Sequence, residues 1–309
     1  MDIIVENVTK KFGPQKAVDD ISFSVKTGEI LGFLGPNGAG KTTMMKIITN
    51  YFSPNGGRVT VGGIPVADNP NEVKKHIGYL PENNPLYLEM PVLDYLEFCA
   101  GLLGVPKNQT GDRVRTMVRI CGLNEEKHKK IGELSKGFRQ RVGLAQAMIH
   151  NPEVLVMDEP TSGLDPNQII EIRKLIRELG KEKTVILSTH ILPEVEATCD
   201  RILIINKGKI VADGTSDTLR KQATGQEILH VKIEDGEPNA VFTALQNLPS
   251  VGLVDFTDRQ LNRFEIQTRP GMSAKRDIFK MCMDKGWALT EMIPFETKLE
   301  DVFRNLTMN

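Results

Sequence analysis

The segment GPNGAGKT, residues 35–42, has the residue types and spacing of a phosphate-binding loop, GxxxxGK[ST]. Its glycines let the backbone curl so that successive N–H groups face a chain of phosphates. Lys41 supplies a mobile positive charge for the β- and γ-phosphates, and the Thr42 hydroxyl can ligate Mg²⁺. An apolar run precedes the segment and a helical pattern follows it, which is the context that this loop requires. The alternative is an ordinary glycine-rich turn with a surface lysine, which would not need a buried strand before it and a helix after it. Because both are expected here, the sequence predicts phosphate binding.

Two acidic residues and a histidine end apolar runs further along the chain, VLVMDEP (154–160) and TVILSTH (184–190). Both runs are typical of buried parallel strands, so Asp158, Glu159 and His190 are expected at the carboxyl edge of a sheet, where open α/β sheets bind ligands. There Asp158 could hold Mg²⁺, Glu159 could deprotonate an attacking water and His190 could donate to the γ-phosphate. An isolated Asp-Glu pair is more often a solvated turn, and an isolated loop histidine is more often incidental. This interpretation therefore depends on the phosphate loop.

The segment LSKGFRQR, residues 134–141, allows two interpretations. Its cations could form a patch for nucleic acid, or the turn at Ser135 could hold a phosphate at the start of a helix. Helical spacing of the following apolar residues indicates a helix that begins near Gly137: Val142, Ala145, Met148 and Ile149. The N-terminal amides of such a helix attract anions whether or not cations are nearby.

The composition argues against the basic patch. The chain has 309 residues, long enough for two ordinary domains, and its 39 Lys and Arg balance 40 Asp and Glu for a net charge of -1. This balance gives no electrostatic footprint for a sequence-independent nucleic-acid binder. The four cysteines form no CxxC pair, so they are expected to be small core residues in a reducing compartment. No secretory signal and no run of about 18 apolar residues is seen, so work at a membrane is expected to go through a partner.

The order of the expected elements indicates a large α/β domain followed by a smaller one. Short β-like runs fill residues 2–34, and a helical pattern extends from 91 to 150. RILIINKGKIVADG is expected to form a terminal hairpin. After a polar joint near residues 224–226 the order becomes βαββαβ, closed by the helix LEDVFRNLT. This order fits a ferredoxin-like α+β module.

In this order and spacing, GPNGAGKTT, LSKGFRQRVGLAQAM, VLVMDEPTSGLDP and STH resemble the motifs of the nucleotide-binding subunit of an ABC (ATP-binding cassette) transporter. The resemblance covers residues 1 to about 222, and the combined motifs are specific to this family among phosphate-loop ATPases. It implies a RecA-like α/β core with a β subdomain and a helical signature subdomain at about 91–150. The domains are then expected at 1–222 and 226–309, the second being an accessory domain.

The resemblance also implies ATP and Mg²⁺ as cofactors and assigns roles by position. Phe12 matches the aromatic residue on which adenine stacks, the alternative being a phenylalanine of the strand core. Ser135 and Gly137 would touch the γ-phosphate of ATP bound to the other subunit, so the turn at 134–137 would be a phosphate cap that acts in trans. Asp165 belongs to the SGLD loop that crosses the dimer interface. The phosphate loop would contribute Gly35, Pro36, Asn37, Gly38, Ala39, Gly40, Lys41, Thr42 and Thr43.

The sequence departs from the family pattern at three positions. Glu82 stands where the family usually has Gln. A carboxylate there can still reach Mg²⁺ through water, but it adds a negative charge close to Asp158 and Glu159. Lys136 and Phe138 replace a Gly and the Gln of the signature LSGGQ, which puts the strength of dimer closure in doubt more than its occurrence.

The function implied by the resemblance is ATP hydrolysis in an ABC exporter. Two copies would form a head-to-tail homodimer around two MgATP and drive a separate integral membrane permease, with no nucleic-acid partner. The protein would be cytoplasmic and peripheral on the inner face of the cell membrane. The tail ETKLEDVFRNLT resembles the ending of ABC-2 export subunits, and LSKGFRQRVGLAQA leans toward the gliding-motility branch. Leu86, Tyr87 and Leu88 would line the groove for the permease, unless they are only local packing.

Two other classes would use a phosphate loop. A soluble ABC ATPase acting on nucleic acid or the ribosome would share the fold, but translation members usually fuse two cassettes and repair members insert a long coiled coil. Neither feature is in the sequence. A phosphate-loop kinase would have no use for a cap that acts in trans. Release of free phosphate without an acceptor separates a hydrolase from a kinase.

Overall fold

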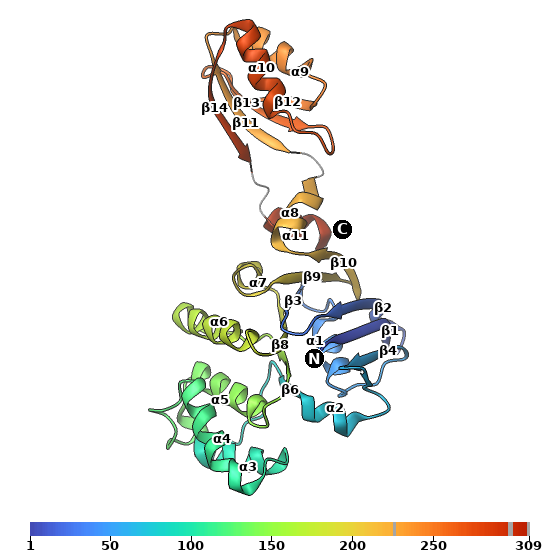
Figure 1. Cartoon of the computed structure of the whole chain (residues 1–309), viewed down its shortest axis with the longest axis vertical. Coiled ribbons are helices and arrows are strands. Elements are labelled where there is room, and N and C mark those ends of the chain that lie inside the picture. Colours follow the sequence, from blue (N-terminus) through green and yellow to red (C-terminus); the bar gives the residue numbers. More distant parts are fainter. Residues whose placement is uncertain (225–226, 296–298, 308–309) are drawn as a thin grey trace. The chain divides into compact units, whose positions relative to one another are not determined.

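The computed structural model of the chain describes residues 1–224, 227–295 and 299–307. The chain divides into two compact units, Met1–Thr215 and Ser216–Asn309 (Figure 1). Part of the expected joint at 224–226 and the first three residues of the tail ETKLEDVFRNLT lie outside the described residues. Within the described part of the chain, every helix is too short or too polar to cross a membrane.

The first unit contains a six-stranded sheet whose order is β10-β9-β3-β8-β7-β6. Its parallel members are β6 (Ile77–Leu80), β7 (Val154–Asp158), β8 (Thr184–Thr189), β3 (Ile30–Leu34) and β9 (Arg201–Asn206). All residues of β3, β7 and β8 are buried, which explains their continuous apolar runs. The strand β10 (Lys209–Gly214) returns antiparallel to β9 and forms the expected hairpin.

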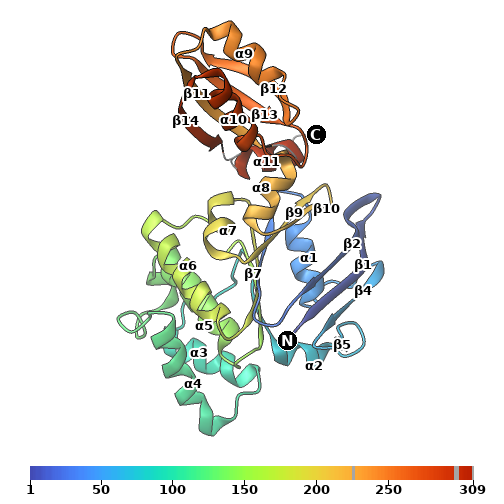
Figure 2. The ribbon, with the colours of Figure 1, turned by 45° about the horizontal axis from the view of Figure 1, so that its top comes forward.

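A second, antiparallel sheet in this unit has the order β2-β1-β4-β5. Its strands are β1 (Ile3–Phe12), β2 (Gln15–Val25), β4 (Gly56–Val61) and β5 (Ile64–Pro65). The helix α1 (Lys41–Ile48) lies between the two sheets (Figure 2), and its buried Met44, Met45, Ile47 and Ile48 share one core with strands of both. The short helix α2 (Pro70–His76) leads into β6. Leu31 and Phe33 of β3 belong to the same core. This core therefore fixes both the strand before the glycine-rich loop and the helix after it.

Helices complete the first unit. The helices α3 (Val92–Leu102), α4 (Lys107–Ile120) and α5 (Lys136–Met148) pack on one another, with the 3₁₀ turn Ile131–Glu133 before α5. The helices α6 (Pro166–Gly180) and α7 (Leu192–Thr198) pack on each other and on β8. The helix α5 begins one residue before the predicted Gly137, because the Ser135 hydroxyl accepts a hydrogen bond from Phe138 N at 3.3 Å and caps it.

The second unit has the element order that the sequence predicts. It comprises α8 (Ser216–Thr224), β11 (Ile228–Glu234), α9 (Pro238–Gln246), β12 (Val251–Asp258), β13 (Arg263–Thr268), α10 (Lys275–Lys285), β14 (Ala288–Phe295) and α11 (Leu299–Thr307). Its antiparallel sheet, ordered β12-β13-β11-β14, shares a core with α9 and α10. The helix α8 contacts α11 and belongs to this unit, although the sequence analysis placed it at the end of the first domain.

Candidate functional site

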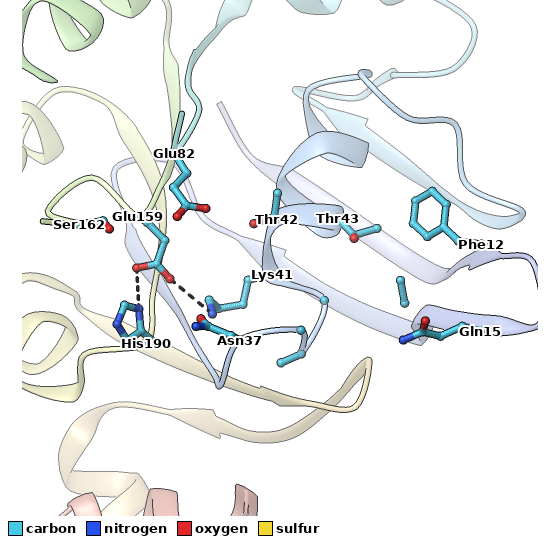
Figure 3. Close-up of a pocket in the computed structure, with 14 residues that line it drawn as sticks. Phe12, Gln15, Asn37, Lys41, Thr42, Thr43, Glu82, Glu159, Ser162 and His190 are labelled. Atoms are coloured by element: carbon cyan, nitrogen blue, oxygen red, sulfur yellow. Dashed lines mark hydrogen bonds and ion pairs between the residues drawn. The ribbon is translucent and has the colours of Figure 1, made fainter. Parts of the chain in front are cut away.

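A cleft of about 600 Å³ lies over the start of α1 in the first unit (Figure 3). It brings together side chains from the loop before α1, the β1–β2 turn, the segment after β6, and the ends of β7 and β8. Its lining residues are Phe12, Gln15, Ala17, Asn37, Gly38, Ala39, Gly40, Lys41, Thr42, Thr43, Glu82, Glu159, Ser162 and His190. Seven of the lining residues come from the predicted phosphate loop and the position after it.

The backbone of the loop before α1 requires glycine. Gly38 and Gly40 have φ values of 80° and 110°, a region that disfavours L side chains. A Cβ on Gly40 would also collide with the Ala17 carbonyl oxygen, and one on Gly35 with the Ile205 carbonyl oxygen. Gly40 supplies no side-chain cap to α1. The amides of the first turn of α1 are therefore available to an anion in the cleft.

Lys41 is the first residue of α1, and only 6% of it is exposed. Its Nζ donates to the carbonyl oxygens of Gly35 at 2.8 Å and Pro36 at 3.3 Å. It also lies 3.4 Å from Glu159 Oε1. Gly35 and Pro36, which the resemblance placed among the nucleotide-binding residues, do not line the cleft, and their carbonyl oxygens accept from this ammonium instead. An ammonium bound to neutral carbonyls and one carboxylate can be drawn to phosphates on a flexible stem.

The side chains of Thr42 and Asp158 meet at the base of the site. Asp158 Oδ1 accepts from Thr42 Oγ1 at 3.2 Å and from Ser188 Oγ at 2.5 Å. These oxygen atoms are the ligand type that Mg²⁺ prefers. Among the described residues no three His, Cys, Asp or Glu side chains are grouped to hold a metal. A Mg²⁺ ion here would therefore complete its coordination with waters and nucleotide phosphates, as this ion usually does.

Glu82 adds a second carboxylate to the wall of the cleft. The neighbouring Tyr79 is sensitive to these charges. Burial raises the pKa of its hydroxyl, and the negative charges of Asp158 and Glu82 contribute to the increase. Carboxylates at this part of the site would favour a bound cation.

Glu159 has a backbone φ of 50°, in the left-handed region. Its N–H donates to both the carbonyl and the hydroxyl oxygen of Ser188, each at 3.1 Å, which holds the residue in this conformation. Its carboxylate is almost fully buried and lies between two partners (Figure 3): Oε2 is 2.9 Å from His190 Nδ1 and Oε1 is 3.4 Å from Lys41 Nζ. The ends of β7 and β8 therefore bring together the two residues that the sequence predicts there.

Phe12 lines the cleft and is 47% exposed. Its ring meets the Phe52 ring edge to face with centroids 5.6 Å apart, and the Lys10 ammonium lies 5.4 Å from its centroid. Phe12 is the last residue of β1, and its exposure does not fit the alternative of a buried strand-core phenylalanine.

Ser135, Gly137 and Asp165 do not line the cleft of their own chain. They lie near one another instead. A Cβ on Gly137 would collide with the Gln168 side-chain amide, and Asp165 Oδ1 accepts from Gln168 N at 3.0 Å. A Cβ on Gly163 would collide with the Lys136 ammonium. The turn at 134–137 and the loop at 162–165 thus form one packed surface.

Sequence reasoning missed Ser188 and Gln15, and it expected Ser162 only as part of the SGLD loop at the dimer interface, whereas Ser162 also lines the cleft of its own chain. Ser188 holds both Asp158 and the Glu159 amide, and the signal was available, since it is a polar residue near the end of an otherwise apolar strand. Gln15 and Ala17 reach the cleft only because the β1–β2 turn folds over the phosphate loop. No local pattern predicts that approach.

Comparison with known proteins agrees with this geometry. A sequence profile described as ABC transporter matches residues 18–162. The uncharacterized ABC transporter ATP-binding protein YxlF of Bacillus subtilis is 34% identical over 300 residues, 97% of each chain. The bacitracin transport ATP-binding protein BcrA of Bacillus licheniformis is 34% identical over 302 residues, 97% of this chain and 95% of that one. A dimeric structure of a post-hydrolysis state of an ATP-binding cassette bound to ADP and Pi has a TM-score of 0.63 and 26% identity, and covers 69% of this chain and 98% of that chain.

Proposed function

The chain belongs to the ATP-binding subunits of ABC transporters and hydrolyses ATP, and on this premise we propose that it is the ATPase of an exporter. The observation that carries the mechanism is the Glu159 carboxylate, buried at the cleft and 2.9 Å from His190. Glu159 orients and deprotonates the attacking water, and His190 donates to the γ-phosphate.

The other cleft residues bind and orient the nucleotide. The amides of residues 38–43 and the Lys41 ammonium face the phosphates, and adenine stacks on Phe12. Lys41 leaves the Gly35 and Pro36 carbonyls as it engages the β- and γ-phosphates. Thr42 and Asp158 would hold Mg²⁺, and Glu82 would reach it through water. When bound, Mg²⁺ neutralises the charge that develops on the β- and γ-phosphate oxygens.

Two copies form a head-to-tail dimer in which each caps the ATP of the other. The absence of Ser135, Gly137 and Asp165 from their own cleft supports a role in trans. So does their assembly into one surface with α5 beginning at that surface, because the first amides of the helix can bind a phosphate. The similar cassette whose structure is dimeric and bound to ADP and Pi supports a dimer.

The membrane partner is a separate permease that docks beside α3. Tyr87 and Leu88 are 54% and 47% exposed, and the Tyr87 ring contacts Tyr95 and Phe98 at 5.9 and 5.7 Å. An exposed aromatic and aliphatic surface of this kind is typical of a docking site. Leu86 is only partly exposed and belongs more to local packing. The protein then lies in the cytoplasm on the inner face of the membrane.

The exporter assignment rests on the relative named for bacitracin transport and on the tail sequence. The ABC-2 type fits both. The relatives compared give no support to the gliding-motility branch, which stays a prediction from the signature sequence alone. We also infer that the second unit is a ferredoxin-like accessory domain, because its βαββαβ order and its strand order β12-β13-β11-β14 fit that fold. We expected the domains at 1–222 and 226–309; a boundary after Thr215, where the compact units divide, would instead move α8 into this accessory domain.

The experiment that tests the proposed function measures free phosphate released from ATP by the purified chain, with and without EDTA, first without any acceptor and then with added metabolites. MgATP-dependent phosphate release that Lys41→Ala abolishes is the expected result. Transfer of phosphate to an added metabolite with no free phosphate would contradict it and favour a kinase.

A further inference from the structure

One buried carboxylate outside the cleft joins the two segments that carry Glu159 and His190. Glu194 lies in α7 and is 5% exposed. Its Oε2 accepts hydrogen bonds from Thr161 Oγ1 at 2.6 Å and from Thr189 Oγ1 at 2.9 Å. Thr161 is two residues after Glu159, and Thr189 is the residue before His190. A single oxygen atom thus ties the loop after β7 to the end of β8.

Burial and further hydrogen bonds fix both threonines in place. Both are buried, at 3% and 0% exposed. The Thr189 hydroxyl also accepts from Ile191 N at 3.1 Å, and Leu164 N donates to the Thr161 carbonyl at 3.2 Å. The Thr189 hydroxyl therefore connects the Glu194 carboxylate to the backbone after His190, and Thr161 is held by its own carbonyl in the turn after Glu159. Movement of Glu194 would move the segments before His190 and after Glu159 together.

Stability alone does not account for a carboxylate at this position. Among the described residues Glu194 Oε1 is buried and has no hydrogen-bond partner, and the same is true of Thr198 Oγ1 one turn later in α7. An unsatisfied buried polar atom is costly, and an apolar side chain in α7 would fill the space without that cost. An apolar side chain could not, however, accept the hydrogen bonds that Oε2 accepts from the Thr161 and Thr189 hydroxyls.

We propose that Glu194 is a positioning residue for ATP hydrolysis. It holds Thr161 and Thr189 on one acceptor and thereby keeps the Glu159 carboxylate at the His190 imidazole. This inference rests on the proposed function, because it concerns the step in which Glu159 and His190 act. Glu194 touches neither the nucleotide loop nor the cleft. Its loss is therefore expected to lower kcat and leave ATP binding in place.

The test compares Glu194→Leu, Glu194→Gln and Val195→Ala in the full chain. Turnover is measured per mole of bound fluorescent ATP analogue, which removes any unfolded fraction from the result. Glu194→Leu is expected to lower kcat about ten- to hundredfold, with KM for ATP within about twofold of the original. Glu194→Gln keeps an oxygen that can accept both hydroxyls and is expected to retain most of kcat. Val195→Ala removes buried packing from the same helix and is expected to lower Tm but not kcat.

If Glu194→Leu does not fold, Thr161→Val and Thr189→Val each remove one hydroxyl at nearly constant shape and are expected to lower kcat in the same way. Unchanged kcat per bound nucleotide in Glu194→Leu, or in both threonine variants, would overturn the inference. Equal losses of kcat in Glu194→Leu and Val195→Ala would also overturn it, because that result indicates general loosening of α7. Absence of phosphate release in the unmodified chain would instead overturn the proposed function.

Discussion

The imidazole of His190 lies 2.9 Å from one carboxylate oxygen of Glu159, while the Lys41 ammonium lies 3.4 Å from the other. The carboxylate is almost completely removed from solvent and has the imidazole on one oxygen and the ammonium near the other. A charged group in such a place interacts more strongly with its neighbours than it would in water. The candidate base, Glu159, therefore contacts both the candidate phosphate-binding cation, Lys41, and the candidate hydrogen-bond donor to the γ-phosphate, His190.

His190→Ala is expected to lower kcat by about a hundredfold while ATP still binds, because the donor to the transition state is lost and the phosphate loop is untouched. Steady-state phosphate release and equilibrium binding of a fluorescent ATP analogue measure the two quantities. The matched control is His128→Ala, an exposed histidine outside the cleft, which is expected to leave kcat unchanged. If His190→Ala had the same kcat as the unmodified protein, His190 would have no part in the mechanism.

Gly40→Ala is expected to abolish ATP binding. An alanine at this position would have to keep a backbone φ near 110°, which L residues rarely adopt, and its Cβ would collide with the Ala17 carbonyl oxygen. The phosphate loop would therefore have to shift. Gly63→Ala is the control, because Gly63 has a φ of 79° with open space around its Cβ direction. It is expected to cost about 1–2 kcal/mol of unfolding free energy and to leave ATP affinity intact. Calorimetry of unfolding and of ATP binding provides both numbers. Normal ATP affinity in Gly40→Ala would show that the loop does not cradle phosphates.

Ser135→Arg is expected to abolish hydrolysis without weakening ATP binding to the monomer, because the phosphate it contacts belongs to the partner's site. Gln140→Arg adds the same charge further along α5 and serves as the control, with hydrolysis retained. ATP affinity is measured at protein concentrations too low for the dimer to form, and turnover is measured at high protein concentration. Together the two measurements separate an effect on ATP binding from an effect on hydrolysis. A loss of monomer affinity in Ser135→Arg would mean that the cap acts within its own chain.

A chain that ends at Thr215 is expected to bind ATP as the full chain does, with weaker dimerisation or weaker coupling to the permease. All residues that line the cleft precede this point. A chain that ends at residue 222 keeps α8 without α11, its partner within the second unit, and is expected to be less soluble and to melt at a lower temperature. Loss of ATP binding by a folded 1–215 chain would contradict the proposed division of labour, and so would full transport without the second unit.

The sequence could predict those parts of the site that depend on local patterns. Glycines at fixed spacing after a buried strand located the phosphate loop, and continuous apolar runs placed Asp158, Glu159 and His190 at the ends of buried strands. The tie from Glu194 to Thr161 and Thr189 could not be predicted, because it joins segments up to 33 residues apart through side-chain packing. The partner of α8 was missed for a similar reason. A short amphipathic helix shows that it has an apolar face but not what covers that face.

The most direct test of the account is turnover and assembly of Glu159→Gln in MgATP. The variant keeps the phosphate loop and the shape of the side chain but loses the base that deprotonates water. It is expected to bind ATP normally, to release phosphate at least about a hundredfold more slowly, and to accumulate as an ATP-bound dimer in light scattering after size exclusion. Glu153→Gln, an exposed carboxylate before β7, is the control and should turn over normally. Phosphate release by Glu159→Gln at the rate of the unmodified protein, with no ATP-dependent dimer, would contradict the account.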